Sequence, residues 1–212
     1  MNKKNCVIMM ILYAVFVLFT ISVTAIDVMP IGPEGSLVGF ASVNGPFHEL
    51  TGVNMFWYKE SEVLGYAALL SCAFFGLFGL VQIIKRKSLL KVDRDLLYLG
   101  IYYVVVLAFY ALFEKVIINY RPVILKEGLE ASYPSSHTML TVCTMSAAML
   151  QIKRRASDIR VKALLMTLCS LVMAGTLIGR LLSGVHWLTD IIGALLLSVA
   201  LVYTYRMVLK SE

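Results

Sequence analysis

Hydrophobic residues gather in six long stretches along the chain, and polar residues separate these stretches. The stretches are Cys6–Ile26, Val63–Ile84, Leu96–Phe113, Thr138–Ile152, Val161–Gly179 and Trp187–Val208. A helix crosses the hydrocarbon core of a bilayer with about 20 apolar residues, and most of the stretches approach that length. The fourth is only about 15 residues long, so we expect its helix to begin earlier, at Ser135 or Ser136. The pattern predicts an all-α bundle of six transmembrane helices.

Composition supports a membrane protein and excludes a soluble one. Of the 212 residues, 59% are hydrophobic and only 15% are charged, and the mean hydropathy is +0.82. A soluble domain carries about 25% charged residues. The length suits one domain, residues 1–212. The four cysteines fall inside apolar stretches without the spacing of a metal site, so we expect them to pack as small apolar residues.

Lysine and arginine are distributed unequally between the two sides of the predicted bundle. Fourteen of the 19 lie at the termini, between the second and third stretches, or between the fourth and fifth. If the six helices alternate in direction, these segments share one side of the membrane. Cytoplasmic segments are rich in Lys and Arg, so both termini are predicted to be cytoplasmic. The net charge of +6 is thus a topology signal, and we expect no nucleic-acid partner.

The amino-terminal segment has some features of a secretory signal peptide. Lys3 and Lys4 precede an apolar run that ends at Val23-Thr24-Ala25, a sequence like a cleavage site. The run is longer than the hydrophobic region of most signal peptides. We therefore favour a retained membrane anchor, and cleavage would leave the orientation of the other five helices unchanged.

A long external loop is predicted between the first two helices, at about residues 27–62. It is rich in proline and glycine and also contains Trp57, Tyr58 and other aromatic residues. Such residues suit a connector that rests on the membrane interface. A loop of this length without regular structure is equally consistent with a lid or a lipid-entry element. The sequence leaves both interpretations open.

Polar groups suited to chemistry fall at the ends of the last four predicted helices. With alternating helices, all of them lie at the external face, opposite most of the basic residues. They are Lys115, Arg121, Ser135, Ser136, His137, Arg180, His186 and Asp190. This convergence predicts one site at the outer face of a cell membrane.

His186 and Asp190 form the centre of this predicted site. They are four residues apart, so on a helix they share one face and the carboxylate can hold the imidazole. Gly184 allows the chain to turn between Arg180 and this helix. A carboxylate inside an apolar helix is costly unless it is paired or used. His48, by contrast, has no such partners in the sequence, and we interpret it as a polar anchor at the interface.

These residue types indicate phosphoryl transfer. Arginine binds phosphate oxygens in a bidentate manner, and lysine adds a point charge. Ser135 or Ser136 begins a helix whose free N–H groups attract anions. One histidine can attack phosphorus while the other protonates the leaving oxygen. The sequence has no cluster of carboxylates suited to a metal ion, so we expect no metal and no cofactor.

The chain resembles the type 2 phosphatidic acid phosphatase superfamily, whose members share three short motifs. The third motif matches best. The family has Ser-Arg, five residues, His, three residues and Asp. Here Gly179-Arg180 is followed by His186 and Asp190 at the same spacing, with glycine in the usual place of serine.

The other two motifs of this superfamily are also present, with differences. Pro-Ser-Gly-His appears as Pro134-Ser135-Ser136-His137. The family has six residues between Lys and Arg-Pro, whereas five separate Lys115 from Arg121-Pro122. On one continuous helix this spacing turns Lys115 about 120° away from Arg121. A residue before proline disfavours helix, so we expect the helix to end before Arg121.

The resemblance implies a six-helix bundle that hydrolyses a lipid phosphomonoester or diphosphate without a metal. His186 would be the nucleophile that forms a phosphohistidine, Asp190 would orient it, and His137 would protonate the leaving group. The phosphate would be held by Lys115, Arg121, Ser135, Ser136 and Arg180. Candidate substrates are an isoprenyl diphosphate such as undecaprenyl diphosphate, phosphatidic acid and phosphatidylglycerol phosphate, and the sequence does not choose among them.

Two alternatives use the same chain differently. A lipid phosphotransferase would pass the phosphoryl group to another lipid or a sugar at the same site. A transporter would require polar residues at mid-bilayer depth in several helices, and the sequence offers only small polar groups there. The sequence does not indicate an oligomeric state.

Overall fold

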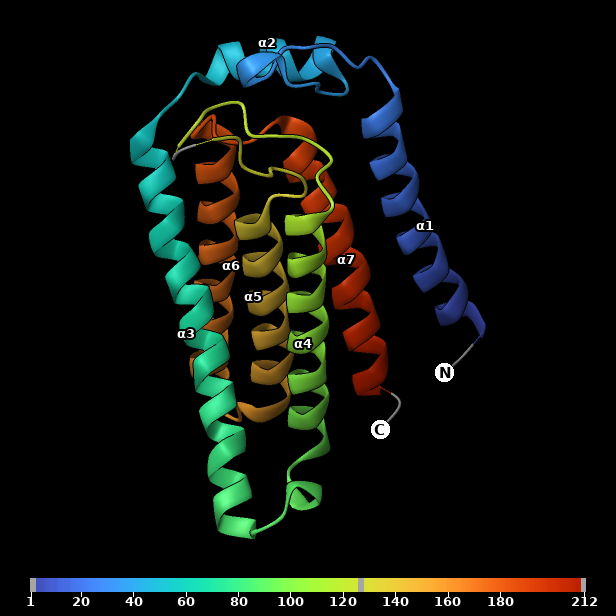
Figure 1. Ribbon diagram of the computed structural model, residues 1–212. Coiled ribbons are helices and arrows are strands. Elements are labelled where there is room, and N and C mark those ends of the chain that lie inside the picture. The colour runs from blue at the N-terminus through green and yellow to red at the C-terminus, as the bar shows by residue number, and fades with distance from the viewer. Residues whose placement is uncertain (1–2, 126–127, 211–212) are drawn as a thin grey trace.

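The structure, a computed structural model, describes residues 3–125 and 128–210 (Figure 1). Its helices are α1 (Lys3–Ala25), α2 (Ala41–Thr51), α3 (Met55–Arg86), α4 (Arg94–Lys115), α5 (Ser136–Arg155), α6 (Ile159–Leu182) and α7 (Leu188–Lys210), with 3-10 turns at Pro33–Gly35 and Leu89–Lys91. Extended pairing in these ranges is limited to two isolated bridges. The all-α prediction is confirmed, while residues 1–2, 126–127 and 211–212 of the predicted domain 1–212 lie outside the described residues.

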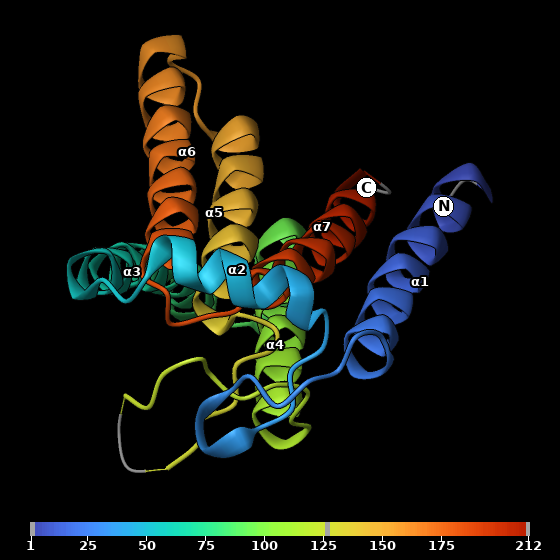
Figure 2. The same ribbon diagram turned by 90° about the horizontal axis from the view of Figure 1, so that it is seen from above.

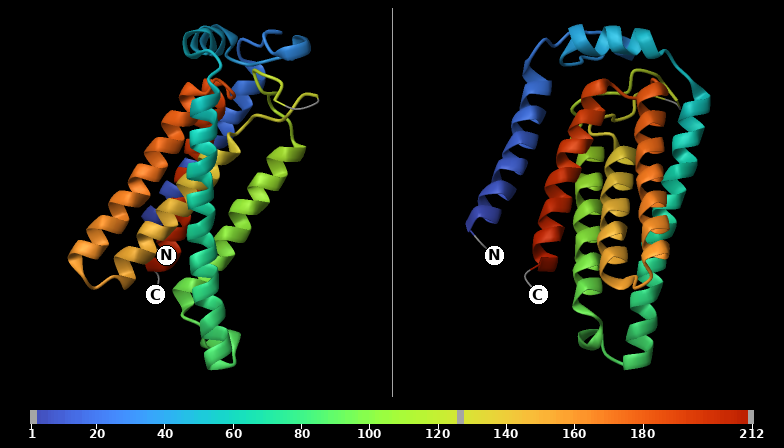
Figure 3. Two further views of the ribbon diagram at one scale, coloured as in Figure 1. Left: turned by 90° about the vertical axis from the view of Figure 1, so that its left-hand side faces the viewer. Right: turned by 180° about the vertical axis from the view of Figure 1, so that it is seen from behind.

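The long helices α1, α3, α4, α5, α6 and α7 run alongside one another, and the shorter α2 lies across one end of the bundle (Figures 1 and 3). The beginning of α1 and the end of α7 lie at the opposite end. Seen from the α2 end, this helix crosses the bundle between α1 and α3 (Figure 2). Five helices are long and apolar enough to cross a membrane, namely α1, α3, α4, α6 and α7. The number of six crossings stays a prediction, since α5 does not meet that hydropathy.

The lower hydropathy of α5 follows from its position within the bundle. Helix α5 packs against α3, α4, α6 and α7, so much of its surface faces protein rather than lipid. Small and polar residues are favoured at such helix contacts, because they permit close approach and hydrogen bonding. Its buried residues include Thr138, Thr141, Thr144, Ala147, Ala148 and Gln151. This central helix carries His137 at its start.

The predicted loop at 27–62 is corrected by the structure. Helix α2 occupies residues 41–51, and α3 begins at Met55 rather than near Val63. The Asn54 side chain caps α3 by accepting hydrogen bonds from the backbone N–H groups of Phe56 and Trp57. This cap satisfies donors that lack a partner within the helix. Hydropathy alone missed the start of α3, because the polar run Lys59–Glu62 separates its aromatic first turn from the apolar stretch.

Helix α2 is fixed to the beginning of α7 by the buried Asn44. The Asn44 amide donates to Thr189 Oγ1 at 2.9 Å and accepts from the Thr189 backbone N–H at 3.2 Å. The same amide donates to the Gly39 carbonyl at 2.8 Å. A fully satisfied buried amide holds the segment in one orientation. Helix α2 is therefore fixed against the beginning of α7. Its role as a connector or a lid stays a hypothesis.

At the end that carries the termini, charged side chains form an ion-pair cluster. Arg155 lies 2.6 Å from Asp95 and 3.2 Å from Asp93, and Arg86 lies 2.8 Å from Asp93. Hydrogen bonds from Gln82 and Arg86 lower the pKa of Asp93 to about 2. The cluster connects α3, the α3–α4 turn and α5 at the end predicted to be cytoplasmic.

Gly184 makes the turn between α6 and α7, as the sequence predicted. Its φ of +64° is in the left-handed region. A Cβ atom at this position would lie 1.8 Å from the carbonyl oxygen of Gly52. Glycine is therefore required both by backbone conformation and by the close approach of the α2–α3 connection.

We predict that Gly184→Ala lowers the free energy of unfolding by about 2 kcal/mol or more, because strain and a backbone clash add. The matched control is Gly100→Ala in the interior of α4, where a Cβ atom meets nothing within 4 Å. Alanine there should leave stability equal or slightly higher, by up to about 1 kcal/mol. Thermal unfolding of both variants in detergent measures this, and equal melting temperatures would contradict it.

Candidate active site

The predicted site residues meet at the α2 end of the bundle. Arg180 comes from the last turn of α6, His137 from the first turn of α5, and Asp190 from the first turn of α7. His186 lies in the α6–α7 connection, and Arg121 lies in the segment between α4 and α5. Helix ends and loops at one end of the bundle thus supply the whole cluster.

The imidazole of His186 is buried and held by hydrogen bonds on both nitrogens. Its Nδ1 lies 3.0 Å from Ser132 Oγ, and the Ser132 hydroxyl also contacts Asp190 Oδ2 at a short distance. Because a carboxylate only accepts, the hydroxyl donates to Asp190 and therefore accepts from the Nδ1–H of His186. This arrangement leaves a lone pair on Nε2. The nucleophilic nitrogen is thus directed away from Asp190, as attack on phosphorus requires.

The pairing of His186 with Asp190 runs through Ser132. The direct distance between Nδ1 and Asp190 Oδ2 is 3.6 Å, longer than a hydrogen bond. Two further donors hold the carboxylate, the backbone N–H of Trp187 at 2.9 Å and the Asn119 amide at 3.3 Å. A buried carboxylate with these partners is fixed in position. The sequence predicted that Asp190 holds His186, and in the structure the Ser132 hydroxyl connects these two side chains.

The surroundings of His186 lower the pKa of its imidazole, burial most strongly and neighbouring positive charge next. Burial, then the cations Arg121 and Arg180, lower the pKa of His186 well below its usual value of 6.5. The ring is therefore neutral at pH 7, which is the form that can attack phosphorus. An arriving phosphate would neutralise the same two cations.

Arg121 faces Nε2 of His186, the ring nitrogen that Ser132 does not bind. Its Nη1 lies 3.4 Å from His186 Nε2, and its Nε lies 3.1 Å from Glu130 Oε2 as an ion pair without hydrogen-bond geometry. The backbone around Arg121 is fixed by a hydrogen bond from its N–H to the Glu130 carbonyl at 3.0 Å. The helix before it ends at Lys115, as predicted from the proline at 122. Arg121 is thus placed where it would contact a phosphorus centre attacked by Nε2.

Arg180 is completely buried and lies against α3. Its guanidinium contacts the Glu62 carboxylate through Nη2 and lies 5.1 Å from the centre of the Tyr58 ring. The same Glu62 oxygen lies 2.8 Å from Nε2 of His137. Glu62 therefore joins Arg180 and His137, two residues that the sequence assigned to phosphate binding and to proton transfer.

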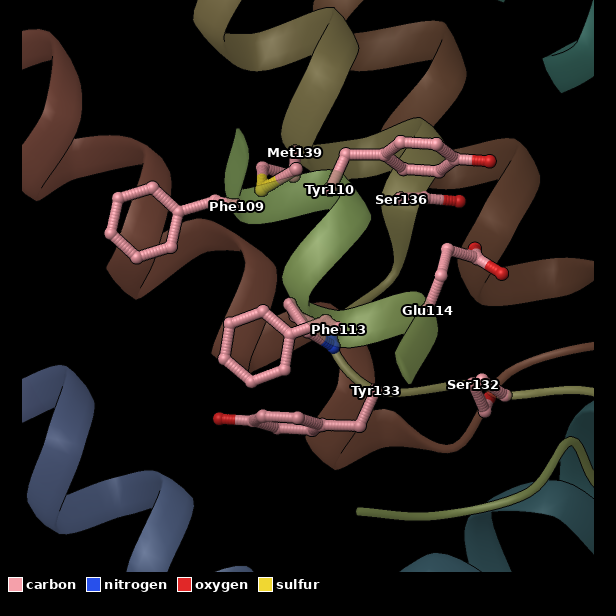
Figure 4. Close-up of a pocket in the computed structure, with 10 residues that line it drawn as sticks. Phe109, Tyr110, Phe113, Glu114, Ser132, Tyr133, Ser136 and Met139 are labelled. Carbon is pink, nitrogen blue, oxygen red and sulfur yellow. The ribbon is translucent and has the colours of Figure 1, made fainter. Parts of the chain in front are cut away.

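The remaining predicted residues are placed unequally. Ser135 is buried, with Oγ 3.0 Å from Thr138 Oγ1, and its backbone N–H donates to the Asp190 carbonyl. Ser136 is half-buried and, with Ser132 and Glu114 of α4, lines a cavity of about 10 Å³ (Figure 4). Such a volume holds about one water molecule, too little for a phosphate. Lys115 is exposed at the end of α4 and makes no ion pair with the described residues, so its role stays a prediction.

Three residues that hold the site were missed by the sequence analysis. Ser132 and Asn119 bind Asp190 from the α4–α5 segment, whose polar loop sequence gave no helical spacing to interpret. Glu62 lies on α3, within the segment interpreted as a loop. One signal was available: Tyr58, Glu62 and Gly65 are spaced as on one helical face.

Comparisons with known proteins give the family and the fold of the chain. The sequence model of the PAP2 superfamily matches residues 96–212. Among solved structures, the chain is similar to that of a transmembrane PAP2-type phosphatidylglycerolphosphate phosphatase from Bacillus subtilis. The TM-score is 0.70 at 14% sequence identity, over 96% of each chain, so this likeness concerns the fold. No curated protein matches the sequence.

Proposed function

The chain belongs to the PAP2 superfamily, and from this premise we propose that it is a multi-pass membrane enzyme that hydrolyses a lipid phosphate. The observation that carries the proposal is the neutral, buried His186, whose Nδ1 is held by Ser132 and whose Nε2 faces the guanidinium of Arg121. The substrate's phosphate would lie at headgroup level, which suits a site at one end of a bundle of apolar helices. The basic residues favour the non-cytoplasmic face for this end.

The reaction proceeds in two displacements. His186 Nε2 attacks phosphorus, the bond to the leaving oxygen breaks, and His137 gives that oxygen a proton. The Nδ1–H of His186 stays bonded to Ser132, which with Asp190 stabilises the positive charge that develops on the ring. Water then attacks the phosphohistidine while His137 accepts its proton, which releases inorganic phosphate and restores both rings. Arg121 and Arg180 hold the phosphoryl oxygens, with Ser135, Ser136 and Lys115 as further candidates.

Three substrate classes remain candidates: an isoprenyl diphosphate, phosphatidic acid and phosphatidylglycerol phosphate. The similar solved structure belongs to a phosphatidylglycerolphosphate phosphatase, which favours including that lipid first in any test. The site itself accounts only for phosphate binding, whereas these classes differ in the rest of the lipid, in the polar headgroup as well as in the apolar chains. A phosphotransferase would use the same first displacement and replace water by another acceptor in the second.

We propose that this chemistry needs no metal ion. Among the described residues, no three His, Cys, Asp or Glu side chains are grouped so that they could hold one. The positive charge that would stabilise the phosphoryl group is supplied by guanidinium groups instead.

We predict that His186→Ala abolishes phosphate release from a panel of lipid monophosphates and diphosphates, because the attacking nitrogen is removed. His48→Ala should keep most of the activity, because its ring lies against Trp187 at 5.5 Å between centres and contacts none of the reacting groups. Purified variants with equal folding allow the comparison. Unchanged release by His186→Ala would discard the mechanism.

We predict that Ser132→Ala lowers kcat by about ten- to a hundredfold, the usual cost of removing a group that orients an active-site residue. The Nδ1–H of His186 would lose its acceptor, while Asp190 stays at a distance of 3.6 Å. The control is Ser146→Ala on α5, whose hydroxyl donates to the Met173 sulfur at 3.6 Å, away from His186 and Asp190. If both variants kept the wild-type kcat, Ser132 would have no part in orienting the ring.

We predict that phosphate release is insensitive to EDTA, because the phosphoryl group is held by arginines. The measurement compares initial rates before and after dialysis against the chelator. Strong inhibition that a divalent ion reverses would contradict the proposal.

A further inference from the structure

A carboxylate contacts two of the groups that are proposed to handle the phosphate, Arg180 and His137. Glu62 Oε1 contacts Arg180 Nη2 and lies 2.8 Å from His137 Nε2. In the proposed reaction, these two groups face a phosphoryl oxygen and the leaving oxygen of the substrate. One oxygen of Glu62 thus contacts the same two groups that substrate oxygens would contact in the proposed reaction.

Close packing of α3 against α6 places Glu62 beside Arg180. A Cβ atom on Gly179 would lie 2.4 Å from a Glu60 carboxylate oxygen and 2.9 Å from Ser61 Cβ. One turn earlier, a Cβ atom on Gly175 would lie 2.6 Å from Leu64 Cδ1. Glycines four residues apart let two membrane helices approach in this way. The glycine that replaces the family's serine at position 179 is therefore explained by the approach of α3.

Glu62 satisfies Arg180 only in part. Arg180 Nε and Nη1 are buried without a hydrogen-bond partner among the described residues. Buried guanidinium donors without partners are costly, so a ligand that supplies more acceptors is favoured. A phosphate group offers several oxygens to the same guanidinium. The Glu62 side chain retains 27% exposure, so it has room to move aside.

We propose that Glu62 is an internal anion that competes with phosphate for Arg180 and His137. The proposal rests on the proposed function of this site. Glu62 compensates the charge of the buried Arg180, and it must leave His137 Nε2 before that nitrogen can give a proton to the leaving oxygen. The competition weakens binding of substrate and of inorganic phosphate alike, and so favours release of the product.

The test measures binding of inorganic phosphate to the intact protein by titration, with fluorescence of the two tryptophans as readout. Glu62→Gln keeps the shape of the side chain and removes its charge. We expect the Kd for phosphate to fall by about tenfold, the effect of one charged hydrogen-bond competitor. Loss of structure weakens binding, so tighter binding cannot arise from structural damage.

Glu60→Gln is the matched control, since it removes the same charge two residues away on α3. Glu60 makes no hydrogen bond or ion pair with Arg180 or His137 among the described contacts. Its Kd for phosphate should stay within about twofold of wild type, as expected for charge at longer range. An equal gain in both variants would overturn the proposal, because general electrostatics would explain it.

Glu62→Asp serves where the glutamine variant does not fold. It keeps the charge but withdraws the carboxylate by one methylene, so phosphate should again bind more tightly than to wild type. Unchanged or weaker phosphate binding in the folded Glu62 variants would overturn the proposal while leaving the proposed function intact. If the wild-type protein bound no phosphate, the proposed function and this inference would both fail.

Discussion

The buried charge of Arg180 is the constraint on which the rest of the site depends. A guanidinium with no solvent exposure, at the end of an apolar helix, is tolerated only with compensating groups. The Tyr58 ring and the Glu62 carboxylate, one turn apart on α3, supply that compensation. The long α3 is therefore part of the site as well as part of the bundle. A cation held in this way in a protein interior attracts an anion much more strongly than one exposed to water.

The hydrophobic pattern of the sequence predicted most helices of the bundle, because the length of an apolar stretch is a local property. It was least accurate at helix starts. Helix α3 extends upstream of its apolar stretch, since Asn54 caps it and the polar run Lys59–Glu62 lies within the helix. Helix α5 is the least hydropathic of the long helices because it faces protein on several sides. Neither property can be read from hydropathy, which reports contact with lipid.

The site was predictable where residues lie within one motif and unpredictable where partners come from distant segments. His186 lies just before α7 and Asp190 in its first turn, four residues apart, so their spacing was informative. The link between them is Ser132, which lies 54 and 58 positions away from them along the chain. No periodicity connects such residues, and only the folded chain brings them together. The same holds for Glu62 and Arg180, which are 118 positions apart.

The departure from the family's third motif and the unpredicted carboxylate are two aspects of one arrangement. A serine at position 179 would place its Cβ atom within 2.9 Å of Ser61 Cβ and closer still to Glu60, so α3 would have to move outward. Outward movement would take Glu62 away from Arg180, and the buried cation would lose its only anionic partner among the described residues. Glycine at 179 and glutamate at 62 therefore depend on each other through packing. Gly179 thus affects phosphate binding indirectly, because it allows α3 to place the negative charge of Glu62 beside Arg180.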